Sequence, residues 1–207
     1  GKGVYSFCMC PGGYVVNASS EDKRLCVNGM SYAKRDSGIA NSAIIVTVNE
    51  TDFGTDLFAG VKFQSALEEK AYYLGKGLIP IETYGDYKDN KRPQSLGNLE
   101  PKIKGRYNIA DLNELLPNNL NIALKEGIAS FDKKIKGFAD NNALLCGIEA
   151  RTSSPIRIIR NENYESNITG IYPCGEGAGY AGGITSAAID GLKVSEAIMN
   201  KFKPLEK

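Results

Sequence analysis

Short apolar and β-branched runs, separated by turn residues, recur through the first fifty residues. The runs cover residues 4–7, 14–16, 25–27 and 43–48. Turn formers lie between them, notably Pro11-Gly12-Gly13 and Asn28-Gly29, as expected of strands joined by tight turns. Residues 1–50 are therefore predicted to form a β-rich segment.

The apolar residues take a helical spacing after residue 51. One helical face would carry Phe63, Ala66, Leu67, Ala71 and Leu74. Gly75 follows as a stop signal. Residues 80–108 hold many charges and turn formers, so they are predicted to form a long loop, either a lid or a plain surface loop.

Two further helices are predicted before the chain returns to strands. Asp111 opens a pattern typical of a capping box, and Pro117 ends the short helix that it predicts. A longer helix is predicted from a stripe of apolar residues: Leu120, Leu124, Ile128, Phe131 and Ile135.

The last part of the chain is predicted to hold short strands and a closing helix. Apolar runs at 144–150, 156–159 and 171–173 are predicted strands, and a helix follows from Ile184 to about Phe202. Its buried side would carry Ile184, Ala188, Leu192, Ile198 and Phe202. Strand-rich ends around a helical middle predict an α+β fold with three parts: residues 1–50, an inserted helical cap at 51–143, and a strand–turn–helix unit at 144–207.

The turn before this closing helix is dense in glycine. Its five glycines are Gly175, Gly177, Gly179, Gly182 and Gly183. Glycine lets a ligand approach the backbone closely, and the first N–H groups of a helix favour anionic or electron-rich atoms. Glu176 lies within the turn and suits a ribose or ribitol hydroxyl better than a phosphate. The turn is either such a ligand site or a mobile connection.

Composition narrows the function classes. The chain has 25 basic and 24 acidic residues and a net charge of +1, which gives no argument for a nucleic-acid partner. No apolar run is long enough to cross a membrane, so a cytoplasmic protein is expected. Histidine is absent and the five cysteines are mostly scattered, so neither a histidine-based catalytic site nor a metal site is predicted.

Two other stretches could carry chemistry. Arg151, Ser153 and Ser154 lie at a predicted strand end, where they could bind and orient a substrate, or could simply cap a turn while Arg151 pairs with Glu149. Cys10 lies two residues from another cysteine and could be a reactive thiol or a buried inert one.

Five stretches together resemble the bacterial uncharacterised FAD-dependent dehydrogenases, whose fold is related to that of flavoproteins with two dinucleotide-binding domains. The stretches read YSFCMCPGGYVVNAS, VNGMSYAKRDSGIANSA, GVKFQSALEEKA, GIEARTSSPIRIIR and GIYPCGEGAGYAGGITSAAIDG. Members of that family begin with a strand and a G-x-G-x-x-G turn, and this sequence does not open with such an element. The resemblance therefore implies the C-terminal portion of such an enzyme without its N-terminal dinucleotide-binding half.

The resemblance also implies roles for particular residues. Gly175 and Glu176 match the pair that faces the ribityl or pyrophosphate part of FAD. Gly182, Gly183 and Ile184 match the turn near the pyrimidine edge of the flavin, where a helix N-terminus stabilises negative charge on the reduced ring.

The resemblance implies a role for three of the four catalytic candidates. Arg151, Ser153 and Ser154 would face the substrate, and Cys10 is a further candidate. Residues 1–50 then become a substrate-side layer, and residues 144–207 become the strand–turn–helix that completes an FAD-binding domain.

The function that this resemblance implies is oxidoreduction. The full-length protein would bind FAD and transfer a hydride or electrons to or from a small-molecule substrate, with NADH or NADPH as a candidate electron donor. The 207-residue chain alone is expected to be inactive. Two alternatives stay open: a non-catalytic nucleotide- or sugar-binding module that uses the glycine turn at 175–184, and a structural domain without a ligand.

Overall fold

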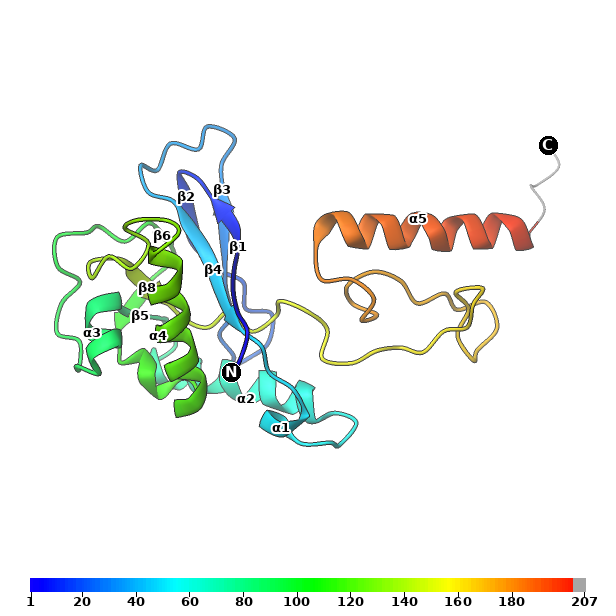
Figure 1. Cartoon of the computed structure of the whole chain (residues 1–207), viewed down its shortest axis with the longest axis horizontal. Helices are drawn as coiled ribbons and strands as arrows, with labels where there is room; N and C mark the ends of the chain where they lie inside the picture. The colour runs from blue at the N-terminus through cyan, green and yellow to red at the C-terminus, as the bar shows by residue number, and fades with distance from the viewer. Residues whose placement is uncertain (203–207) are drawn as a thin grey trace. The chain divides into compact units, whose positions relative to one another are not determined.

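The computed structural model describes residues 1–202, and contacts among residues divide the chain into two units (Figure 1). Unit 1 consists of Gly1–Phe53 and Phe63–Ala150, and unit 2 consists of Gly54–Lys62 together with the chain from Arg151 onward. The described chain combines small sheets with helices, which confirms the predicted α+β class.

Unit 1 begins with the predicted β-rich segment. Strand β1 (Val4–Cys10) pairs antiparallel with β4 (Asn41–Val46), and the register shifts between Phe7 and Cys10. A second sheet has β2 (Gly13–Asn17) at its centre, antiparallel to β3 (Val27–Ser31) and parallel to β6 (Ile103–Lys104). The strand prediction for residues 1–50 is confirmed, except that β3 begins where the predicted run at 25–27 ends.

A third sheet occupies the region for which a long loop is predicted. Strand β5 (Ile79–Thr83) lies between β7 (Tyr107–Ile109), which is parallel to it, and β8 (Leu144–Cys146), which is antiparallel. Helix α3 (Tyr84–Asp89) follows β5 directly, and Thr83 caps it. The loop prediction for residues 80–108 is therefore wrong in its first ten residues, which β5 and α3 occupy, and near its end, where β6 and β7 lie. A proline within a short apolar run favours a turn over a central strand, and Pro80 lies inside β5.

The predicted helices of the middle section are present. Helix α1 (Glu50–Phe53) is short, and α2 (Ala59–Leu74) ends before Gly75, as predicted. The segment opened by Asp111 is one turn of 3-10 helix, η1 (Leu112–Glu114), in which the Asp111 carboxylate accepts a hydrogen bond from the Asn113 N–H at 3.0 Å. Helix α4 (Asn118–Asp132) lies against β1 and β4 (Figure 1) and ends before Ile135.

One hydrophobic core joins the β-rich segment to the helices. Leu25 and Val27 pack in the same cluster as Ala71 of α2, Tyr84 of α3 and Ile128 of α4. Because side chains from both sides of residue 50 share this core, the contact-based boundaries at residues 53, 63 and 150 differ from the predicted boundaries at 50 and 143.

Unit 2 has little regular structure apart from helix α5 (Ile184–Lys201). Figure 1 shows residues 151–183 as an irregular chain that runs alongside this helix. The strands predicted at 156–159 and 171–173 do not form among the described residues, since neither segment has a neighbouring strand to pair with. The strand–turn–helix prediction is correct for its turn and its helix, and wrong for its strand.

The predicted buried side of α5 is wrong as well. Ile184 is 92% exposed, Leu192 is 66% exposed and Phe202, just beyond the helix, is 53% exposed, whereas Val194 is 4% exposed. No element of unit 2 covers the apolar stripe of α5 among the described residues. No helix among the described residues has both the length and the apolar character needed to span a membrane.

Candidate functional site

The glycine turn, residues 174–183, is shaped by its own backbone. Gly175 and Gly179 have φ values of 72° and 83°, which lie in the left-handed region that favours glycine. A Cβ at Gly179 would lie 2.5 Å from the carbonyl oxygen of Ile156. Gly179 N–H donates to the Glu176 carbonyl at 2.9 Å, and Tyr180 N–H donates to the Gly175 carbonyl at 3.0 Å. These two glycines are therefore explained by the fold of the chain itself.

Gly177 and Gly182 have no such explanation. A Cβ at either position would meet no described atom of the chain within 4 Å, and neither residue has a left-handed φ. The described residues of this chain would therefore not obstruct a side chain at either position. The bare backbone at these positions leaves an open surface that a flat group can approach closely.

The N-terminus of α5 adjoins this surface. Gly183 is the N-cap and supplies no side-chain hydrogen bond, and no acidic residue lies in the first turn. The Ser186 hydroxyl donates to the Gly183 carbonyl at 3.0 Å. Free N–H groups and the positive end of the helix dipole favour a negatively charged or electron-rich atom beside this turn.

A partly buried ion pair holds the other side of the turn. Arg160 donates two hydrogen bonds to the two carboxylate oxygens of Asp190, at 2.9 and 2.6 Å, and a third to the Pro173 carbonyl at 2.8 Å. Asp190 also accepts from the Gly175 N–H at 2.9 Å. Hydrogen bonding from Arg160 lowers the pKa of the Asp190 carboxyl, although partial burial opposes the effect. Asp190 is therefore an ionised acceptor that links Arg160 to the first glycine of the turn.

Aromatic rings complete this arrangement. The Arg160 guanidinium carbon lies 3.6 Å from the centre of the Tyr180 ring and 4.6 Å from that of Tyr164. The Tyr180 hydroxyl donates to the Ile158 carbonyl at 3.1 Å, and Arg157 donates to the Gly179 carbonyl at 3.0 Å. The segment 156–160 thus holds the turn at several points. Arg160, Tyr164 and Asp190 are not identifiable as part of a site from the sequence, because the contacts join residues up to thirty positions apart.

The predicted cofactor residues lie together on this turn. Gly175, Glu176, Gly182, Gly183 and Ile184 follow one another along the turn and into the first residue of α5. Their role in binding FAD stays a prediction.

The predicted catalytic residues are placed differently. Ser154 donates to the Ile156 carbonyl at 2.8 Å and accepts from the Ile156 N–H at 3.4 Å, which is the turn-capping alternative. Arg151 and Ser153 lie on the same segment of unit 2 and are exposed. Cys10 belongs to unit 1, where its thiol donates to the Cys8 carbonyl at 3.3 Å beside the irregularity of β1.

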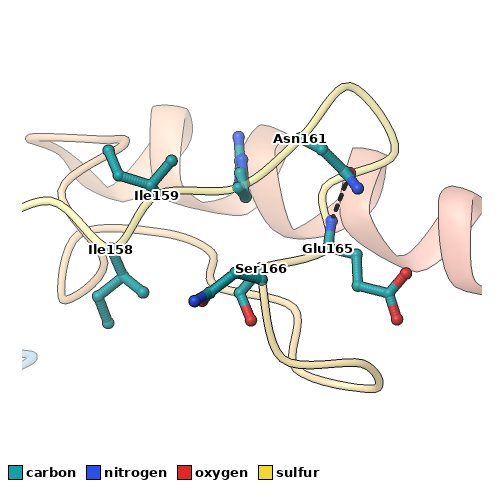
Figure 2. A pocket seen from close by; sticks show the side chains of 7 residues that line it. Ile158, Ile159, Asn161, Glu165 and Ser166 are labelled. Carbon is teal, nitrogen blue, oxygen red and sulfur yellow. Dashed lines mark hydrogen bonds between the residues drawn. The ribbon is translucent and has the colours of Figure 1, made fainter.

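An open pocket of about 590 Å³ lies on the neighbouring loop and is lined by residues 158–161 and 165–167. Figure 2 shows the isoleucines at its rim and the hydrogen bonding of Asn161 to Glu165, whose N–H reaches the Asn161 side chain at 3.1 Å. Ile159 is largely exposed there. The pocket lies beside the glycine turn rather than on it, so it does not define the candidate site.

The comparisons with known proteins bear on both units. Residues 1–152 match the family model of the FAD-dependent protein, C-terminal domain-like. The chain belongs to this family. An uncharacterised protein of Clostridium beijerinckii is 52% identical over 205 residues, which cover 97% of this chain and 38% of the relative. The chain thus spans little more than a third of the length of that relative.

The family match confirms the predicted kinship with FAD-dependent proteins and indicates an association with FAD. It ends at residue 152, close to the end of unit 1 at Ala150. The glycine turn and α5 therefore lie outside the matched domain. The dehydrogenase type, the substrate and the electron donor stay predictions.

Proposed function

We propose that the chain is the C-terminal part of an FAD-dependent oxidoreductase and that the glycine turn with the start of α5 forms one wall of the flavin site. The main support is the open backbone at Gly177 and Gly182, where nothing in the described chain requires glycine. A flat ring system that lies against this backbone would leave no room for a Cβ. FAD, when bound, would supply the transfer of a hydride or electrons to or from a small-molecule substrate.

The residues of the turn would bind and orient the cofactor. Glu176 would accept a hydrogen bond from a ribityl or ribose hydroxyl, since a carboxylate is an acceptor and repels phosphate. The N–H groups at Gly183 and Ile184, with the dipole of α5 behind them, would stabilise negative charge at the pyrimidine edge of the ring. Arg151 and Ser153 are the candidates for orienting the substrate, with Ser154 and Cys10 as further candidates.

The exposed face of α5 supports a second part of the proposal, namely that unit 2 packs against an N-terminal dinucleotide-binding half. Ile184, Ile189, Leu192 and Met199 are all exposed on this helix. Burying an aliphatic side chain contributes about 1.5–3 kcal/mol, so covering this face would stabilise the assembled protein substantially. The greater length of the relative from Clostridium beijerinckii is consistent with a further domain that could cover it.

Flavin content tests the proposal most simply. The full-length protein and this 207-residue chain would be purified in parallel, and their visible spectra recorded before and after addition of FAD. A long form that carries flavin and a short form that lacks it are expected, because the chain supplies only one wall. The electron donor would be tested by adding NADH or NADPH anaerobically and following the loss of the flavin bands.

The binding-module alternative predicts a different outcome. A full-length protein that stays colourless with FAD but binds adenosine nucleotides or sugars at the glycine turn would replace the oxidoreductase proposal with a non-catalytic binding function.

A further inference from the structure

We infer that Arg160 is a positioning residue for the flavin site: it orients Asp190, and Asp190 holds the Gly175 N–H at the start of the glycine turn. This inference rests on the proposed function, because it concerns the same turn. It adds two residues to the site, neither of which is expected to contact the flavin.

The geometry of the pair is that of a fixed fork. Both carboxylate oxygens of Asp190 receive a guanidinium N–H, at 2.9 and 2.6 Å, and one of these oxygens also receives the Gly175 N–H at 2.9 Å. A bidentate contact restricts the rotation of both side chains. The position of the Asp190 oxygen, and with it the Gly175 peptide, is therefore determined by Arg160.

Burial makes this contact sensitive to substitution. The side chains of Arg160 and Asp190 are 9% and 12% exposed. Water cannot readily replace either partner at that exposure, so removing one leaves the other with an unpaired charge. The pair differs in this respect from the Lys201–Glu165 pair of the same unit, in which Lys201 is 42% exposed.

Arg160 also contacts the turn directly. Its guanidinium stacks on the ring of Tyr180, which lies within the turn, at 3.6 Å from the ring centre. It donates to the Pro173 carbonyl, immediately before the turn, at 2.8 Å. Arg160 thus contacts the residue just before the turn directly. It acts on the first glycine of the turn through Asp190, and it contacts the later part of the turn at Tyr180. Lysine cannot reproduce both the fork and the stacked plane.

The position of the turn matters because the proposed contact with flavin is made by backbone. A misplacement of about 1 Å can lower the rate of an enzymatic reaction by about a hundredfold. A shift of the Gly175 peptide would move Glu176, the proposed acceptor for the ribityl or ribose hydroxyl, and would alter the surface at Gly177.

The test uses the full-length protein with the variants Arg160→Lys and Asp190→Asn. Lys201→Met is the matched control, since it removes an ion pair from the same helix without touching the turn. FAD affinity would be measured by titration of the apoprotein, together with the band shape of the bound flavin and the thermal midpoint. Both single variants are expected to bind FAD at least tenfold more weakly than the wild type, with altered absorption bands of the bound flavin. The double variant is expected to bind FAD no more weakly than the weaker-binding single variant. The control should stay within twofold.

Three outcomes separate the explanations. Wild-type affinity and band shape in both variants would overturn the inference, and so would additive losses in the double variant, because one linked chain of contacts cannot give additive effects. If Arg160→Lys does not fold, Asp190→Asn retains the shape of the side chain and decides the question. A wild-type full-length protein that binds no FAD would instead overturn the proposed function.

Discussion

Glu82 provides the clearest physical prediction of the fold, because it is a fully buried carboxyl group. Its exposed fraction is 0%. One oxygen accepts the Leu112 N–H at 2.6 Å, and the other has no hydrogen-bond partner among the residues that the structure describes. Burial raises the pKa of Glu82 from its ordinary value of 4.5 to about 8; the Leu112 N–H opposes the shift, and nearby Asp111 and Asp86 add to it.

The direction of the pH dependence follows from this shift. Between pH 4.5 and about 8 the folded state holds a proton that the unfolded state releases. The contribution of Glu82 to stability is therefore fully present below pH 4.5 and is lost as the pH rises to about 8. At about 1.4 kcal/mol per pKa unit, the total loss has an upper limit of about 5 kcal/mol.

The substitution Glu82→Gln removes the titration and keeps the shape. The amide can still accept from Leu112, but it brings two N–H donors into a site with an unpartnered position, so it should cost about 1–3 kcal/mol at acidic pH. Near pH 9 the wild type carries a buried charge, and the variant should then be equally stable or more stable. The difference in free energy of unfolding, variant minus wild type, should therefore rise by up to about 4 kcal/mol between about pH 5 and pH 9.

Urea unfolding at a series of pH values, followed by circular dichroism, measures this quantity. Glu126→Gln, on the exposed face of α4, is the control and should run parallel to the wild type. Parallel stability profiles for Glu82→Gln and the wild type would show that the pKa of Glu82 is not raised by folding. A stability of the variant relative to the wild type that falls with rising pH would show the same.

Two further substitutions test packing. Gly127→Ala should destabilise the chain by about 1–3 kcal/mol in urea unfolding, despite the better helix propensity of alanine. The reason is that the new Cβ would lie 2.4 Å from a methyl carbon of Val4. A stabilised variant would show that β1 moves aside at little cost. Leu192→Ala should leave the unfolding of this chain within about 0.5 kcal/mol, since Leu192 is exposed, yet should cost about 2–5 kcal/mol in the full-length protein, where the side chain is proposed to be buried. Equal small effects in both proteins would contradict the proposed packing of α5.

Patterns within short stretches of sequence predict those strands and helices whose signals lie within the element itself. Apolar runs between turn residues predict β1, β2 and β4, and the helical spacing of apolar residues predicts α2 and α4. Strand β5 is missed because Pro80 suggests a turn, while the evidence for a central strand lies in its partners, β7 and β8. These partners are distant in sequence, so no local pattern identifies them.

The same limit applies to the candidate site. The density of glycine predicts the turn and the start of α5. It does not distinguish Gly175 and Gly179, which the backbone requires, from Gly177 and Gly182, which it does not. Arg160 and Asp190 are missed altogether, because a pair thirty residues apart is brought together only by tertiary structure.

The apolar stripe of α5 is a different kind of error. Its spacing predicts a buried face, but unit 2 leaves most of that face exposed. A sequence pattern shows that a surface is apolar and says nothing about which molecule buries it.

The FAD affinity of the full-length Gly182→Ala variant tests whether flavin lies against the glycine turn. The added methyl meets no described atom of the chain within 4 Å, so it should not alter folding. Gly191→Ala, which adds a methyl to an equally open position on α5, is the matched control. We expect the Gly182→Ala apoprotein to keep the thermal midpoint of the wild-type apoprotein but to bind FAD at least tenfold more weakly, while the control binds normally. Unchanged FAD affinity in Gly182→Ala would contradict the claim that flavin lies against the glycine turn.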